Sequence, residues 1–152
     1  MPDLTANVKW LNQLPPRATH DQPYLVHFWT LSCASCLTTL PDVSALMKKY
    51  ESHIHAVSVN LEPEDDAEVT EQAKRAGLDA PLAIDEEALL SDAFGYNFIP
   101  AFYLFDASGQ MRYFQQGQDH LGTLEQRIKR LLRKQRFPIG NRCTSLYFHN
   151  DR

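Results

Sequence analysis

Residues 24–36, with the sequence YLVHFWTLSCASC, join a short apolar segment to a pair of cysteines. Residues 24–29 are rich in aromatic and branched apolar side chains, which is typical of a buried strand. Apolar residues then recur at spacings of three and four over residues 37–50, which predicts an amphipathic helix. Cys33 and Cys36 are therefore expected where a buried strand passes into a helix.

The rest of the chain continues this alternation of strands and helices. Further strands are expected at residues 53–60 and 101–105, and further helices at residues 69–76, 86–94 and 121–136. Residues 106–109 are typical of a turn, after which residues 111–115 pair back as a hairpin. Alternating strands and helices favour parallel pairing, whereas a hairpin is antiparallel. The sequence therefore predicts an α/β fold with one mixed central sheet and helices on both faces.

The composition narrows the function classes. The chain has 152 residues, of which 43% are hydrophobic and 22% are charged, as expected for one globular domain. A formal net charge of −4 argues against a nucleic-acid-binding protein, which usually has a basic face. No apolar run approaches the length of a membrane span. We predict a single domain over residues 1–136 and a C-terminal tail at residues 137–152.

The first residues bear on location. Residues 1–14 have neither a basic segment nor a continuous apolar segment, so they do not predict a signal peptide. The expectation is a cytoplasmic protein, although a chain trimmed of its export signal would look the same. Three cysteines are too few for a disulfide-stapled secreted scaffold. In a cytosolic protein, a close cysteine pair is more often redox-active or metal-binding than structural.

The spacing of Cys33 and Cys36 suits thiol–disulfide exchange. A cysteine at a helix N-terminus is close to the positive end of the helix dipole and to free N–H groups, both of which stabilise its thiolate. The thiolate is the species that attacks disulfides. Cys36 lies one helical turn later on the same face and can resolve a mixed disulfide formed at Cys33. We therefore predict that Cys33 is the nucleophile and Cys36 is the resolving thiol.

Two other interpretations of the pair stay open. The cysteines can be inert and buried, or they can form half of a zinc site completed by Cys143 and by histidines such as His53 and His55. The sequence has no second CxxC and no H-x₃₋₅-H pair, so we predict no metal site. Cys143 lies in the predicted tail and is interpreted as a bystander.

Residues 28–36, FWTLSCASC, together with Pro41, resemble the thioredoxin superfamily. Residues 95–109, GYNFIPAFYLFDASG, resemble the segment that carries the cis-proline, the next strand and a turn in that family. The resemblance covers about residues 20–134 and is greatest to the TlpA/ResA type. It implies a thioredoxin fold and a thiol–disulfide oxidoreductase without a bound cofactor, since the dithiol itself cycles between two redox states. A peroxidase of the related peroxiredoxin type is not predicted, because no Pro-x-x-x-Thr-x-x-Cys is present.

The resemblance also implies roles for Ile99 and Pro100. Pro100 would be cis beside the cysteines, and the backbone of Ile99 would pair with an extended substrate peptide. TlpA/ResA-type proteins are usually exported or membrane-anchored and usually reduce specific proteins. The implied partners are protein disulfides and an upstream reductase or dithiol donor. An extracytoplasmic oxidase or isomerase, and a non-catalytic binding module, stay open as alternatives, and the sequence does not predict the oligomeric state.

Three further residues are candidate modulators of the pair. Ser35 stands where the family usually has proline, so it adds an N–H donor near the sulfur atoms. His27 aligns with the buried aspartate of thioredoxins and could deprotonate the second cysteine or, if charged, favour a thiolate. The alternative for His27 is a strand histidine that makes an ordinary hydrogen bond in the core or faces outward. Trp29 is expected to pack beneath the active-site turn.

Overall fold

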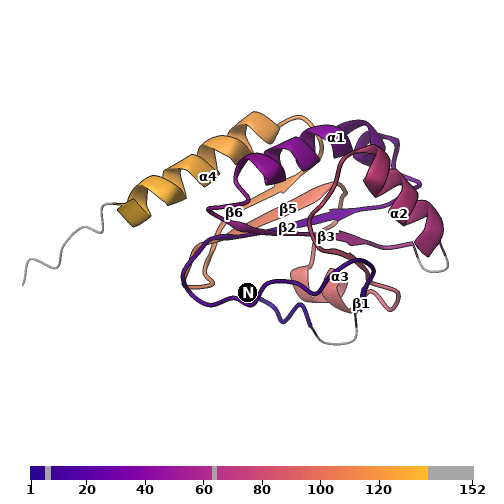
Figure 1. The fold of residues 1–152 in the computed structure, drawn as a ribbon, viewed down its shortest axis with the longest axis horizontal. Helices are drawn as coiled ribbons and strands as arrows, with labels where there is room; N and C mark the ends of the chain where they lie inside the picture. Colours follow the sequence, from indigo (N-terminus) through magenta and orange to yellow (C-terminus); the bar gives the residue numbers. More distant parts are fainter. Residues whose placement is uncertain (6–7, 63–64, 137–152) are drawn as a thin grey trace, which may run out of the picture.

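The computed structural model describes residues 1–5, 8–62 and 65–136. Its strands are β1 (Lys9–Trp10), β2 (Tyr24–Trp29), β3 (His55–Asn60), β4 (Leu82–Ile84), β5 (Ala101–Phe105) and β6 (Met111–Gln116). Its helices are α1 (Ala34–Lys49), α2 (Asp66–Arg75), α3 (Leu89–Phe94) and α4 (Leu121–Arg136). The strands form one six-stranded sheet in the order β1-β4-β3-β2-β5-β6 (Figure 1).

The sheet is mixed because of how its strands are connected. Helical crossovers join β2 to β3 and β3 to β4, and both pairs are parallel. The tight turn before β6 makes β5 and β6 antiparallel, and β5 is also antiparallel to β2. The central strand β2 therefore has a parallel neighbour on one side and an antiparallel neighbour on the other.

Helices cover both faces of the sheet, with α1, α2 and α4 on one face and α3 on the other (Figure 1). Alternate residues of β2 point to opposite faces. Leu25 therefore packs in the core beneath α1 and α4, whereas Val26 and Phe28 pack in the core on the α3 side. Because both faces are covered, all six residues of β2 are buried. The predicted mixed sheet with helices on both faces is confirmed.

The structure differs from the predicted elements at their edges. β1 and β4 were not predicted, because two or three residues are too few to show a period. β3 begins at His55, since a turn that closes on the Tyr50 carbonyl occupies the residues just before it. α3 begins only at Leu89, where the preceding Ala88 has a positive φ of 56°.

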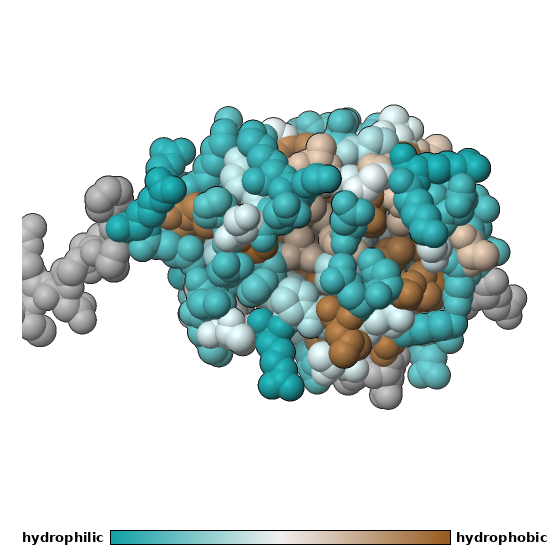
Figure 2. Space-filling view, viewed as in Figure 1, coloured by the Kyte–Doolittle hydropathy of each residue, from teal (hydrophilic) through white to brown (hydrophobic). Residues whose placement is uncertain are grey.

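Two further observations concern the surface and the ends of the chain. Most of the face shown in Figure 2 is hydrophilic, with hydrophobic side chains confined to small patches. Within the described ranges, no helix is both long and apolar enough to cross a membrane. The predicted tail at residues 137–152, which includes Cys143, lies outside the described residues, and the single domain over residues 1–136 stays a prediction.

Candidate active site

Cys33 is the N-cap residue of α1. The chain leaves β2 at Trp29, turns, and enters the helix at Ala34, so Cys33 keeps an extended backbone with φ −95° and ψ 103°. The Cys36 backbone N–H donates to Cys33 Sγ at 3.1 Å. The sulfur thus takes the place that a serine or aspartate oxygen usually holds at an N-cap. It lies at the positive end of a 16-residue helix dipole, which favours a negative charge on it.

The two cysteines differ in their access to solvent. They are joined as a disulfide. Cys36 is fully buried in the core beneath α1, whereas Cys33 is only partly buried. A substrate that approaches from solvent can therefore reach the Cys33 sulfur but not the Cys36 sulfur.

The second motif lies directly beside Cys33. The Ile99–Pro100 peptide bond is cis, and the Ile99 carbonyl oxygen lies 3.9 Å from Cys33 Sγ. The side chain of Ser35 is closer still, since its hydroxyl lies 3.2 Å from the same sulfur and can donate to it. The structure therefore brings together Cys33, Cys36, Ser35, Ile99 and Pro100 from two distant segments of the chain.

Gln116, which the sequence did not single out, supports the segment before the cis bond. Its side-chain oxygen accepts hydrogen bonds from the backbone N–H groups of Asn97 and Phe98, both at 2.9 Å. The Phe98 side chain is 69% exposed next to Ile99. Gln116 thus fixes the backbone that presents Ile99, while Phe98 leaves an apolar ring on the surface.

His27 lies in the centre of the sheet, on the α1 side. It is fully buried, its Nδ1 lies 3.0 Å from Ser58 Oγ, and its ring stacks on Phe102 with centroids 5.0 Å apart. Desolvation by burial lowers the pKa of His27 to about 3. The imidazole is therefore neutral at neutral pH. Trp29 is also fully buried and packs in the same core as Cys36.

A second residue that the sequence did not reveal is Glu62. Its carboxylate oxygen Oε1 accepts from the backbone N–H of Ser32 at 3.3 Å and from the Ser32 hydroxyl at 3.2 Å. The Glu62 backbone N–H donates to Asn60 Oδ1 at 2.7 Å, which fixes the start of the loop after β3. A carboxylate is thus bound to the residue that precedes Cys33.

The comparisons with known proteins agree with this geometry. A family model described as the AhpC/TSA family matches residues 1–114. The chain belongs to this family. The thiol-disulfide oxidoreductase YkuV of Bacillus subtilis (strain 168) is 36% identical to it over 138 residues, which cover 87% of this chain and 93% of YkuV. The thiol-disulfide oxidoreductase ResA of Geobacillus thermodenitrificans is 27% identical over 88 residues, or 57% of this chain and 50% of ResA.

A solved structure supports the same assignment of this AhpC/TSA chain. The solution structure of a thioredoxin-like protein in the oxidised form matches with a TM-score of 0.77 and 34% sequence identity, covering 88% of this chain and 95% of that one. The expected thioredoxin-like fold is therefore confirmed, with ResA-like relatives. The protein is a thiol–disulfide oxidoreductase that carries the cysteine pair Cys33–Cys36.

The predicted cytoplasmic location is wrong. The ResA, StoA, DsbE and DipZ proteins among the matches belong to an extracytoplasmic, membrane-anchored group. The prediction rested on the first residues alone, and these are no guide to where an AhpC/TSA chain of this type acts.

In the described part of the chain, no further side chains are placed to complete a zinc site with Cys33 and Cys36. Residues 1–5, 8–62 and 65–136 contain no group of three or more His, Cys, Asp or Glu side chains placed to hold a metal ion. His53 lies in the turn before β3 rather than on the strand that holds His55. Because Cys33 and Cys36 bond to each other, the geometry favours redox chemistry at this pair.

Proposed function

We propose that the protein reduces protein disulfides, with Cys33 as the attacking thiol, Cys36 as the resolving thiol and Ile99–Pro100 as the segment that holds the substrate chain. The observation that carries this proposal is the unequal exposure of the two cysteine residues. Cys36 is 0% exposed, whereas Cys33 is partly exposed at the helix N-terminus. Only Cys33 can meet a substrate disulfide first.

The reaction then follows in two exchange steps. The Cys33 thiolate attacks one sulfur of the substrate disulfide, and the other substrate sulfur leaves as a thiolate and takes up a proton. The Cys36 thiolate next attacks Cys33 Sγ, which forms the Cys33–Cys36 disulfide and releases the second substrate thiol. Two electrons pass to the substrate, and an upstream reductase or another dithiol has to return them.

The surface beside Cys33 suits an extended peptide. An extended chain that pairs with the backbone at Ile99 would carry its disulfide past the Cys33 sulfur, 3.9 Å from the Ile99 carbonyl oxygen. The exposed ring of Phe98 offers an apolar contact for a neighbouring substrate side chain. Protein disulfides in extended or unfolded segments therefore fit this site best.

The charges near the pair support the reducing direction. A strong oxidant of this class stabilises its reduced, thiolate form. Here the hydrogen-bond donors to Cys33 Sγ are the neutral groups of Ser35 and the Cys36 backbone, and the buried His27 is neutral. Within the described residues, no lysine or arginine hydrogen-bonds to Ser32, Cys33 or Ser35.

The test is to trap the mixed disulfide, in a Cys143→Ser background so that no other thiol reacts. Reduced Cys36→Ser protein, mixed with a disulfide-bonded protein such as insulin, should accumulate a covalent adduct through Cys33. Cys33→Ser should form no adduct and should lose turnover by about 10³-fold or more. Equal adduct formation in both variants would contradict the assignment. No adduct in Cys36→Ser would favour a non-catalytic binding module.

A further inference from the structure

The loop between β3 and α2 places a negative charge at the active-site turn. Glu62 Oε1 accepts two hydrogen bonds from Ser32, one from its backbone N–H and one from its hydroxyl. The Ser32 hydroxyl also lies 3.2 Å from Thr30 Oγ1, and this hydrogen bond links the first and last residues of the turn at residues 30–32. The carboxylate is therefore held in one place beside the turn that presents Cys33.

The position of Glu62 is fixed from the other side as well. Its backbone N–H donates at 2.7 Å to Asn60 Oδ1, and Asn60 is a fully buried residue at the end of β3. β3 is hydrogen-bonded to β2, with Asn60 opposite Trp29. Glu62 is thus anchored to β3, and the neighbouring strand β2 leads directly to the turn that carries Cys33.

We propose that the Glu62 carboxylate, held on Ser32, destabilises the thiolate of Cys33 and so makes the Cys33–Cys36 pair a stronger reductant. Glu62 is a positioning residue, because it contacts Ser32 and not the reacting sulfur. This inference rests on the proposed role of Cys33 as the attacking thiol. It names a means of setting the redox potential that lies outside the CxxC sequence itself.

The physical reason is repulsion between like charges. Ser32 and Cys33 are neighbours in the chain, so the carboxylate bound to Ser32 is held only one residue away from the residue that carries the sulfur. A negative charge in that position disfavours the thiolate and opposes the helix dipole. Because the thiolate occurs only in the reduced form, destabilising it shifts the equilibrium toward the disulfide. The protein then gives up its electrons more readily.

The other groups that face Cys33 do not cancel this charge. The Cys36 N–H, the Ser35 hydroxyl and the Ile99 carbonyl are all neutral, and they come from α1 and from the segment before β5. His27 is neutral beneath the helix, on β2. Among the groups that hydrogen-bond to the described residues Ser32, Cys33 and Ser35, the charged group is the Glu62 carboxylate.

The Glu62→Gln variant tests the effect of the charge alone, because it removes the charge and keeps the hydrogen-bond acceptor. The glutamine side chain keeps an oxygen that can accept from Ser32, but it carries no charge. The redox equilibrium of Cys33–Cys36 with glutathione should shift about threefold toward the dithiol. That shift corresponds to a potential about 14 mV less negative, since tenfold is 29.6 mV for two electrons. The pKa of Cys33, followed by the pH dependence of alkylation, should fall.

Glu51→Gln is the matched control. Glu51 is exposed just beyond the C-terminal end of α1, and the 16-residue helix is about 24 Å long. That separation exceeds the screening length of about 10 Å at 0.1 M salt. Glu51→Gln changes the net charge by the same amount and should leave the redox equilibrium unchanged. The effect of Glu62→Gln should also shrink in 1 M salt, where screening acts within about 3 Å.

The outcomes separate this inference from the proposed function. A shift in Glu62→Gln that is absent in Glu51→Gln and weakens in high salt supports the inference. An unchanged equilibrium in Glu62→Gln, an equal shift in Glu51→Gln, or a shift that persists in 1 M salt would overturn it. If the unsubstituted protein itself shows no reversible dithiol–disulfide equilibrium, the proposed function fails first and the inference falls with it.

Discussion

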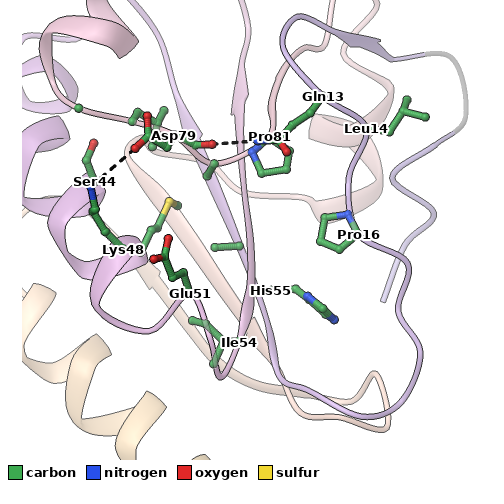
Figure 3. Close-up of a pocket in the computed structure, with 15 residues that line it drawn as sticks. Gln13, Leu14, Pro16, Ser44, Lys48, Glu51, Ile54, His55, Asp79 and Pro81 are labelled. Atoms are coloured by element: carbon green, nitrogen blue, oxygen red, sulfur yellow. Dashed lines mark hydrogen bonds and ion pairs between the residues drawn. The ribbon is translucent and has the colours of Figure 1, made fainter.

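The two ends of α1 offer very different surfaces. Near its C-terminal end lies a cavity of about 310 Å³, bounded by α1, the start of β3 and the segment before β4, with Gln13, Leu14 and Pro16 across from the helix (Figure 3). At its N-terminal end, Cys33 lies on the surface beside Ile99. The residues that line the cavity do not include Cys33 or Ile99.

Neither Cys33 nor Cys36 lines the hollow in Figure 3, so the proposed exchange does not take place there. Two contacts join polar groups across the cavity: the Gln13 side chain donates to the Asp79 carbonyl, and Lys48 Nζ lies 3.9 Å from the Asp79 carboxylate. At the other end, the partly exposed Cys33 lies with its sulfur 3.9 Å from the Ile99 carbonyl oxygen. A protein that acts on other proteins needs an accessible edge more than a deep pocket.

The largest expected effect is a sensitivity to acid that comes from His27, in the sheet beneath α1, and not from the cavity. The pKa of His27 is about 3 in the folded protein, compared with an ordinary value of 6.5. Below pH 6.5 the His27 imidazole therefore binds a proton in the unfolded chain but stays neutral in the folded chain. The free energy of unfolding falls as the pH falls. Between pH 7 and pH 5 this contributes a loss of about 2 kcal/mol in the free energy of unfolding.

Urea unfolding at the two pH values measures this loss. His27→Gln should remove about 2 kcal/mol from the difference between pH 7 and pH 5. The matched change at the cavity is Asp79→Asn, which breaks an ion pair whose side chains are 69% and 82% exposed. That variant should keep the full difference, because exposed ion pairs contribute little. An unaltered pH dependence in His27→Gln would contradict the buried, neutral state of the imidazole.

A smaller difference concerns the side-chain amides that hydrogen-bond to the backbone near each end of α1. Gln116 accepts from Asn97 and Phe98 beside the site, and Asn12 accepts from Leu82 and donates to the Ala80 carbonyl beside the cavity. Gln116→Ala should lower kcat/KM for protein disulfide reduction about tenfold, because the backbone at Ile99 loses its fixed position.

Asn12→Ala is the comparison for that variant. It removes a similar set of hydrogen bonds and should cost about 1 kcal/mol of stability. Its kcat/KM should stay within about twofold of the unsubstituted protein, since the change lies at the other end of α1. Steady-state rates and melting curves for both variants give the answer. Equal losses of activity would show that the two ends are not independent.

The smallest expected effect is at the rim of the cavity. Leu14 is 78% exposed, so Leu14→Ser removes little buried apolar surface. Stability should change by less than about 0.5 kcal/mol, and activity should not change. A large loss of activity in this variant would show that the cavity takes part in function. Thermal unfolding and the insulin reduction rate are sufficient measurements.

Much of the fold was predictable because the central elements have a clear pattern. The apolar run at residues 24–29 coincides with β2, and the helical period at residues 121–136 coincides with α4. β1 and β4 were missed, since two or three residues show no periodicity. The location was predicted wrongly, because it was inferred from the first residues rather than from relatives.

The site was predictable only where its residues form a motif. Cys33 and Cys36 were singled out from the local sequence, whereas Ile99 and Pro100 were implied by the resemblance to the thioredoxin superfamily, and the structure places Ile99 beside Cys33. Glu62 and Gln116 carry no such signal. Glu62 meets Ser32 across 30 positions, and Gln116 meets Asn97 across 19, so their contacts exist only once the sheet has formed.

The central claim is that Cys33–Cys36 forms a reducing pair, and its reduction potential tests this most directly. Equilibration of the Cys143→Ser protein in defined thiol–disulfide buffers, followed by counting of free thiols, gives the value. The account predicts a potential near that of thioredoxin, about −270 mV. A value near about −120 mV, as in the oxidant DsbA, would contradict the reducing role.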